Sequence, residues 1–167
     1  MPPCEVYLVR HAIAAERGPD WPDDTKRPLT ERGIARFTEA VAGLAWLGVA
    51  LDDIYTSPLI RTRQTAQLLA KGLDGHAAVK GLEALAPGHA PADVVRALAE
   101  VVTRRQIALV GHEPGLGELA AFLIGSRRPI PFRKGGVCRI DVESFGAKRP
   151  GELQWMLPPK VLRKLGS

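Results

Sequence analysis

The chain is poor in cysteine and has no long apolar run. Its 167 residues include two cysteines, Cys4 and Cys138, which lie in separate apolar segments and form no C-x-x-C pair. We therefore expect buried free thiols rather than a disulfide framework. No apolar run reaches the length of a membrane helix. The first residues also lack a basic stretch followed by an apolar one, so we expect no signal peptide and a cytoplasmic protein.

Aromatic residues are scarce as well, at 5% of the chain. No segment interleaves them with basic residues, as a platform for single-stranded nucleic acid does. The net charge of +5 favours anionic partners in general, but the basic clusters are short and scattered. We therefore expect neither a nucleic-acid partner nor a membrane partner.

The length and the apolar content of 46% fit one domain over residues 1–167. Strand and helix signals alternate, which favours an α/β fold with helices layered on a sheet. We expect strands near 4–9, 53–56, 107–110, 137–142 and 152–156. We expect helices over 30–47, 58–72 and 114–125, and a further helix that begins near Pro91. The segment 12–28, rich in proline and aspartate, is either a surface loop or a cover over a crevice.

Two of the expected helices have clear start signals. Thr30 is a plausible N-cap, and Gly48 a plausible stop, for a helix whose core face is formed by Ile34, Phe37, Val41 and Leu44. Ser57 is expected to cap the next helix, with Pro58 at its first position.

Two buried strands each end at a histidine. Val6–Val9 precedes Arg10 and His11, and Ile107–Val110 precedes Gly111 and His112. Because ligands of α/β sheets bind beyond the carboxyl ends of the strands, the two histidines could face one crevice. Arg61 lies at the start of the helix after Ser57, where backbone N–H groups also favour an anion.

These residue types suit phosphoryl chemistry. Guanidinium groups such as those of Arg10 and Arg61 neutralise a phosphoryl group through paired hydrogen bonds. A neutral imidazole can then attack phosphorus, provided that its second ring nitrogen is held by a partner. A second imidazole can donate a hydrogen bond to the phosphoryl oxygens in the transition state. No phosphate-binding P-loop and no H-E-x-x-H zinc motif occurs in the sequence.

Three segments together resemble a known family. Leu8-Val9-Arg10-His11-Ala12, the run Thr56 to Ala66 and Val110-Gly111-His112-Glu113-Pro114 look like successive signatures of the histidine phosphatase superfamily, also called phosphoglycerate mutase-like. Residues Pro28 to Gly33 resemble a further segment of that superfamily, and residues Leu153 to Lys160 resemble the ending of the compact SixA-type phosphohistidine phosphatases. One departure is Ala12, where many members have glycine.

The resemblance implies a three-layer α/β/α sandwich around a mostly parallel mixed sheet. It also implies a covalent phosphohistidine intermediate on His11, with Arg10, Arg61 and His112 binding and stabilising the phosphoryl group. It implies no metal and no cofactor.

The leaving group decides the substrate. An alkoxide needs a general acid, and Glu83 is the obvious candidate, although a plain surface carboxylate is the alternative; Glu16 and Asp20 are weaker candidates. An imidazole leaves more easily, so we expect dephosphorylation of phosphohistidine in a protein, such as a histidine phosphotransfer domain. A phosphomonoesterase acting on a small phosphorylated substrate, and a non-catalytic phosphohistidine-binding module, remain alternatives. The segment from Arg127 to Lys134 either docks the partner or is simply solvated.

Overall fold

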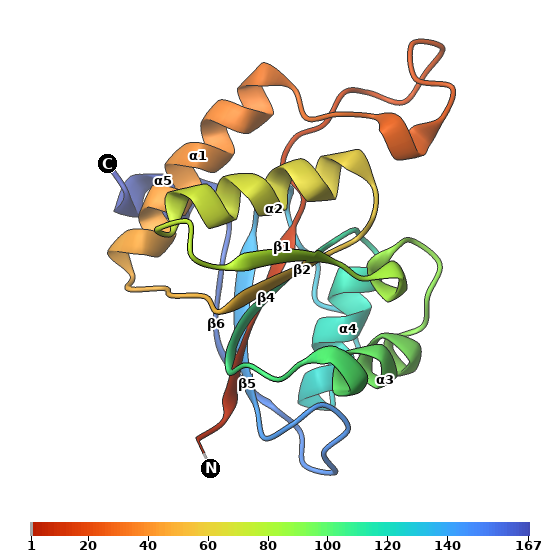
Figure 1. Cartoon of the computed structure of the whole chain (residues 1–167), viewed down its shortest axis with the longest axis vertical. Coiled ribbons are helices and arrows are strands. Elements are labelled where there is room, and N and C mark those ends of the chain that lie inside the picture. The colour runs from red at the N-terminus through yellow and green to blue at the C-terminus, as the bar shows by residue number, and fades with distance from the viewer. Residues whose placement is uncertain (1) are drawn as a thin grey trace.

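A six-stranded sheet lies between two layers of helices in the computed structural model, which describes residues 2–167 (Figure 1). The strands are β1 (Cys4–Arg10), β2 (Asp53–Thr56), β3 (Ala78–Gly81), β4 (Gln106–Gly111), β5 (Val137–Val142) and β6 (Glu152–Leu157). The helices are α1 (Glu31–Trp46), α2 (Ile60–Gly72), α3 (Pro91–Val101), α4 (Gly115–Ile124) and α5 (Pro159–Leu165), with 3-10 turns η1 (Asp24–Lys26) and η2 (Glu83–Leu85).

The sheet is mixed and mostly parallel, as predicted. Its strand order is β3-β2-β4-β1-β5-β6. The pairs β3–β2, β2–β4 and β4–β1 are parallel, whereas β5 is antiparallel to both of its neighbours. The carboxyl ends of β2, β4 and β1 therefore lie side by side along one edge of the sheet.

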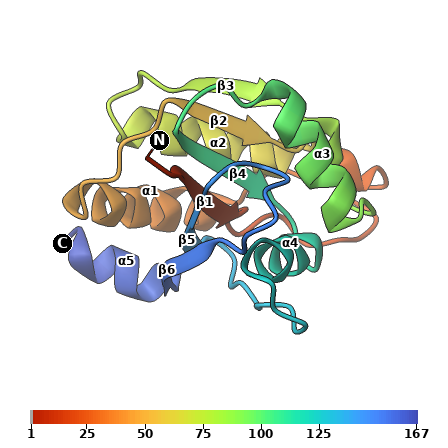
Figure 2. The same ribbon diagram turned by 90° about the horizontal axis from the view of Figure 1, so that it is seen from below.

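Alternation along the central strands divides the core into two faces. Val6 and Leu8 of β1 pack with residues of α3 and α4, whereas Tyr7 and Val9 pack with residues of α1, α2 and α5. Such alternation is the consequence of the two-residue period of a strand. Figure 2 shows the resulting three layers, with α3 and α4 on one side of the sheet and α1, α2 and α5 on the other.

Among residues 2–167, no helix combines the length and the apolar character needed to cross a bilayer.

Helix α1 begins and ends as predicted, but one of its expected core residues is wrong. The Thr30 hydroxyl accepts a hydrogen bond from Gly33 N at 2.9 Å, and Gly48 follows the helix with a φ of 76°. Ile34, however, is 38% exposed. The buried stripe begins at Gly33 instead, where a Cβ atom would lie 2.1 Å from the Ile13 carbonyl oxygen. This close approach turns Ile34 toward solvent.

The start of α2 also differs from the prediction. The helix begins at Ile60 with Leu59 as its N-cap, so Ser57 is not the capping residue and Pro58 is not its first residue. The Ser57 hydroxyl contacts His112 instead, as described below. The sequence reading further missed β3 and α5, which are only four and seven residues long.

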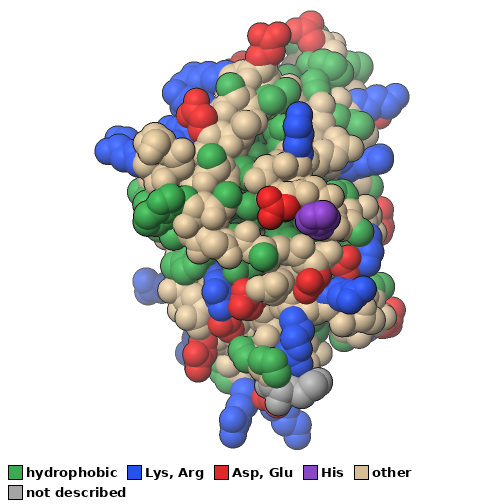
Figure 3. Space-filling view, turned by 60° about the vertical axis from the view of Figure 1, so that its left-hand side comes forward, with side chains coloured by type: hydrophobic (Ala, Val, Ile, Leu, Met, Phe, Trp, Pro, Cys, Tyr) green, Lys and Arg blue, Asp and Glu red, His purple; other side chains and the backbone are tan. Residues whose placement is uncertain are grey.

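The outer surface carries charges of both signs. On the face drawn in Figure 3, basic and acidic side chains are interspersed with hydrophobic ones. Cys4 and Cys138 are buried as free thiols, as expected.

Candidate active site

His11 lies directly beyond β1, and its ring orientation is fixed by the backbone. Its Nδ1 lies 2.7 Å from the carbonyl oxygen of Ala12. Since a carbonyl can only accept, Nδ1 carries the proton and Nε2 keeps its lone pair. Burial, with a smaller contribution from the Arg61 and Arg10 charges, lowers the pKa of His11 to about 4 against the opposing effect of the Ala12 carbonyl. The ring is therefore neutral near pH 7.

His112 lies beyond the neighbouring strand, β4, with the opposite ring nitrogen engaged. Its Nε2 lies 2.8 Å from the Ser57 hydroxyl, which is fully buried beyond β2. The Ser57 oxygen also accepts a hydrogen bond from Leu59 N at 3.3 Å. The hydroxyl proton can therefore point to Nε2, which leaves the proton of the neutral ring on Nδ1. Burial lowers the pKa of His112 to about 3, with Arg61 as the next cause.

The sheet register brings the two imidazoles together. Arg10 pairs with Gly111 across β1 and β4, so the residues that follow them leave the sheet at the same level. His11 N donates to the Gly111 carbonyl at 3.1 Å, and the ring centroids of His11 and His112 are 5.4 Å apart. The planes are tilted by 57°, so the rings are not stacked. Two histidines that are distant in sequence thus face each other at one edge of the sheet.

Two guanidinium groups lie beside these rings. Arg10 Nη1 donates to the Phe132 carbonyl at 2.6 Å. Arg61, in the first turn of α2, is 2% exposed and donates from Nη1 to the Asp24 carbonyl at 2.9 Å. Burial lowers the pKa of both guanidinium groups, but arginine remains protonated under ordinary conditions.

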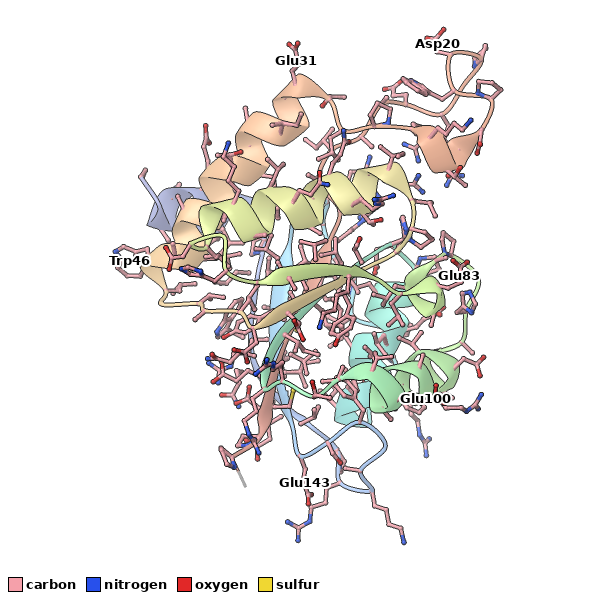
Figure 4. All side chains as sticks on the ribbon, in the orientation of Figure 1. Asp20, Glu31, Trp46, Glu83, Glu100 and Glu143 are labelled. Atoms are coloured by element: carbon pink, nitrogen blue, oxygen red, sulfur yellow. The ribbon has the colours of Figure 1, made fainter. Side chains whose placement is uncertain are left out.

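Asp24 joins the segment 12–28 to the candidate site. Its carboxylate lies 3.1 Å from Arg61 Nη2, 3.0 Å from Arg27 Nε and 3.2 Å from Arg17 Nε. Neighbouring hydrogen bonds and positive charges lower the pKa of this carboxyl group against the effect of its burial. The segment is therefore held by ion pairs and forms one wall of the site. Its tip carries Asp20, which lies away from the sheet edge in Figure 4.

The buried polar atoms without a partner are concentrated at this site. Among residues 2–167 there are four such atoms, and three of them are Arg10 Nε, Arg61 Nε and His112 Nδ1. The fourth, Asp53 Oδ2, has no hydrogen-bond partner in the same sense but forms an ion pair with Lys80 Nζ, 2.9 Å away. Because an unsatisfied buried polar group is costly, such atoms in a native fold require an explanation. These three potential donors, from β1, from α2 and from the turn after β4, provide the means to hold an oxyanion.

A cavity of about 350 Å³ connects these groups. Its lining includes all four residues of the predicted phosphoryl site together with parts of the segment 12–28. A second cavity, of about 420 Å³, adjoins it and shares Pro87, His112 and Glu113 with it. The lining of the second cavity is mainly apolar and comes from η2, α3, α4 and the segments that connect η2 to α3 and β4 to α4.

Of the two carboxylates of the first cavity, one is held by backbone hydrogen bonds and the other is exposed. Glu16 and Glu113 line it. The Glu113 carboxylate accepts from Gly117 N at 2.7 Å and from Phe132 N at 3.3 Å. Glu83 is exposed on η2 and lines neither of these two cavities; Figure 4 shows it at the outer edge of the molecule. Its role as a general acid stays a prediction.

Sequence reasoning missed the residues that hold these groups. The sequence predicts Ser57 as a helix cap and gives no indication that Asp24 or Phe132 belongs to the site. The position of Ser57 directly beyond β2 was an available signal, because β2 ends beside β4 in the sheet. The Phe132 carbonyl carries no sequence signal, since any residue could supply it.

Within residues 2–167, no group of three or more His, Cys, Asp and Glu side chains is arranged to hold a metal ion.

Known proteins resemble this chain in sequence and in fold. The family model of the histidine phosphatase superfamily (branch 1) matches residues 6–87. An uncharacterised protein of Picosynechococcus sp. is 40% identical over 165 residues, covering 95% of this chain and 98% of the relative. The phosphohistidine phosphatase SixA of Escherichia coli is 25% identical over 162 residues, covering 95% and 96% of the two chains.

Solved structures show the same fold. A protein histidine phosphatase SixA, solved with tungstate, matches with a TM-score of 0.83 at 23% identity, covering 95% of this chain and 99% of that one. A SixA structure from Agrobacterium tumefaciens matches with a TM-score of 0.76 at 26% identity, covering 94% and 99%. The chain belongs to the histidine phosphatase superfamily, and it has the fold of the SixA type within that superfamily.

Proposed function

We propose that the protein is a phosphatase that uses His11 as its nucleophile and that its substrate is phosphohistidine in a protein. The observation that carries the proposal is the set of three unpartnered buried nitrogens, Arg10 Nε, Arg61 Nε and His112 Nδ1, beside the neutral His11 ring. A phosphoryl group can accept a hydrogen bond from each of them. The similar SixA structure with tungstate, another tetrahedral oxyanion, supports this assignment.

In the first chemical step, the lone pair of His11 Nε2 attacks phosphorus, and the bond from phosphorus to the leaving group breaks. The proton on Nδ1 stays hydrogen-bonded to the Ala12 carbonyl, 2.7 Å away, which stabilises the positive charge that develops on the ring. His112 Nδ1–H donates to a phosphoryl oxygen as negative charge is redistributed. Water then attacks phosphorus, and the phosphorus–nitrogen bond to His11 breaks to release phosphate.

The leaving group favours a phosphorus–nitrogen substrate. An alkoxide is strongly basic and benefits from a general acid. Of the carboxylates lining the cavity, Glu113 already accepts two backbone hydrogen bonds and Glu16 is exposed in the segment 12–28. A protonated imidazole leaves without such help. The similarity to SixA of Escherichia coli over nearly the whole of both chains supports the same substrate class, with a histidine phosphotransfer domain as one candidate.

A small-molecule phosphomonoesterase is the second candidate. It is favoured by the apolar cavity of about 420 Å³, which shares His112 with the proposed phosphoryl site and could receive an organic leaving group. In that case Glu83, on the nearby η2, would approach the leaving oxygen as general acid. A non-catalytic phosphohistidine-binding module would keep the two arginines but would not need both imidazoles.

A substrate panel separates these functions. Wild type, His11→Ala and Glu83→Gln are assayed on a phosphohistidine peptide and on an alkyl phosphate. We expect turnover of the peptide by wild type and by Glu83→Gln, and none by His11→Ala. Turnover of the alkyl phosphate alone, with loss in Glu83→Gln, would establish the second candidate. Binding of the peptide without multiple turnover would establish the module.

A further inference from the structure

A strongly basic groove lies on the α1 and α5 side of the proposed phosphoryl site. It encloses about 370 Å³, and its charged lining consists of five basic side chains, Arg36, Arg133, Lys134, Lys160 and Arg163. These come from α1, from the segment before β5, and from α5. The remaining lining, which includes Phe37 and Pro159, is apolar or backbone. The proposed reaction uses none of these five side chains.

Little of this charge is neutralised within the protein. Arg163 lies 3.8 Å from Glu39, which is itself largely exposed. Among residues 2–167, no carboxylate lies within 4.0 Å of the charged nitrogens of Arg36, Lys134 or Lys160. Uncompensated charge of one sign in a concave surface raises the local concentration of oppositely charged groups.

The groove is continuous with the proposed site. Lys134 lines both cavities, and its charge contributes to the lowered pKa of His11. The adjacent Gly135 N is positioned 3.1 Å from the carbonyl oxygens of both Arg10 and His11. This backbone contact fixes the rim of the groove to the end of β1. A group that extends from a bound phosphoryl group can therefore reach the groove over Lys134.

The exposure of the side chains that line the groove indicates that its ligand is a protein surface and not a small anion. At the phosphoryl site, the donors are buried and held by hydrogen bonds, as a compact anion requires. In the groove, Arg133, Lys134 and Lys160 are exposed, and Arg36 and Arg163 are half-buried. Exposed, flexible cations provide long-range attraction and adaptable contacts rather than a preformed pocket.

We propose that this basic groove docks an acidic segment of the protein that carries the phosphohistidine. The proposal rests on the proposed function, and it adds a recognition element beyond the phosphoryl group. Acidic side chains next to the phosphohistidine would pair with Arg36 and Lys160 while the phosphoryl group contacts Arg10 and Arg61. The protein would then select substrates by the charge that surrounds the modified histidine.

The test compares two phosphohistidine peptides, one flanked by glutamates and one by glutamines, with phosphoramidate as a small substrate. The double variant Arg36→Gln/Lys160→Gln removes two groove charges. The matched control, Lys148→Gln/Arg149→Gln, removes two exposed charges from the β5–β6 connection at the opposite end of β5. We expect the groove variant to lower kcat/KM on the glutamate peptide about three- to tenfold at low salt, as for other rim charges.

The same variant is expected to keep its kcat/KM on the glutamine peptide and on phosphoramidate, and the control to match wild type throughout. Salt at about 0.5 M should erase the difference, because it screens exposed charges. An equal loss on phosphoramidate would mean that the groove acts on the small anion itself, and it would overturn the docking proposal. An unchanged kcat/KM on the glutamate peptide would overturn it as well.

A binding measurement keeps this test independent of the proposed function. If wild type hydrolyses no phosphorus–nitrogen substrate, the proposed function fails, but the groove can still be examined with a fluorescent glutamate-rich peptide that carries no phosphate. Salt-sensitive binding by wild type and by the control, weakened in Arg36→Gln/Lys160→Gln, would support the groove as an acidic docking surface. Equal binding by all three proteins would exclude it.

Discussion

Ser57→Ala tests how the protonation of His112 is set for its proposed role in catalysis. The Ser57 hydroxyl lies 2.8 Å from His112 Nε2 in a fully buried position, and it is the side chain that hydrogen-bonds to that ring. Without it, Nε2 is buried with no donor, and nothing favours the tautomer that carries the proton on Nδ1. We therefore expect the proportion of rings with Nδ1–H directed at the phosphoryl group to fall.

The size of the effect follows from the hydrogen bond that is lost. A buried neutral hydrogen bond contributes about 1–1.5 kcal/mol net, which corresponds to a fall in kcat of roughly tenfold. His112→Ala removes the donor itself and should cost about 10²–10³ in kcat. In the His112→Ala background, Ser57→Ala should have no further effect, because the two residues act through one interaction.

The control is Thr62→Val, which disturbs the same turn without touching the histidine. The Thr62 hydroxyl is buried and donates to the carbonyls of Ser57 and Leu59 at 3.0 and 2.9 Å. Both variants should lower the free energy of unfolding, measured by urea denaturation, by about 1–2 kcal/mol. Only Ser57→Ala should lower kcat. A kcat within twofold of wild type for Ser57→Ala would refute the role given to this hydroxyl.

Two further predictions concern charge and pH. Arg61→Lys should lower kcat/KM about a hundredfold, because lysine cannot keep the contact with Asp24 and also present a second donor to the phosphoryl group; steady-state kinetics would check this, and a loss below threefold would contradict it. The pKa of His11 falls from 6.5 to about 4 on folding, so between these values the unfolded chain binds more protons than the folded one. Its contribution to stability is thus complete above about pH 6.5 and is lost as the pH falls toward 4, by roughly 1.4 kcal/mol per pH unit. Urea denaturation at several pH values should show that the free energy of unfolding falls less with decreasing pH in His11→Asn than in wild type. An equal fall in the two proteins would be evidence against a buried neutral ring.

The alternation of strand and helix signals was sufficient to predict a layered α/β fold, whereas the three layers and the mostly parallel sheet followed from the family resemblance. Val6–Val9 and Ile107–Val110 are continuous apolar runs typical of strands buried on both faces, and the helix caps at Thr30 and Gly48 follow from local backbone chemistry. The short β3 escaped prediction because its four residues are all exposed and show no buried apolar pattern, unlike those of the equally short β2. The seven residues of α5 span only two turns, which carry little helical periodicity. Ile34 was misassigned because the close approach of Gly33 to the Ile13 carbonyl is a tertiary contact.

The candidate site, like the fold, was predictable only where local sequence carries the signal. Arg10, His11, Arg61 and His112 were selected from sequence because strand ends and side-chain chemistry are both visible there. Their supporting contacts were not, since Asp24, Ser57 and the Phe132 carbonyl reach the site only through the folded geometry. The unpartnered nitrogens are likewise a property of the packed structure.

The formation of a phosphohistidine on residue 11 is the most direct measurement of the proposed chemistry. Wild type and His11→Ala are mixed with radiolabelled phosphohistidine peptide, quenched within milliseconds in alkali, and mapped by proteolysis. We predict a label on His11 that survives alkali and is lost in acid, and no label in His11→Ala. A label on another residue, or wild-type turnover by His11→Ala, would contradict the assignment of His11 as the nucleophile.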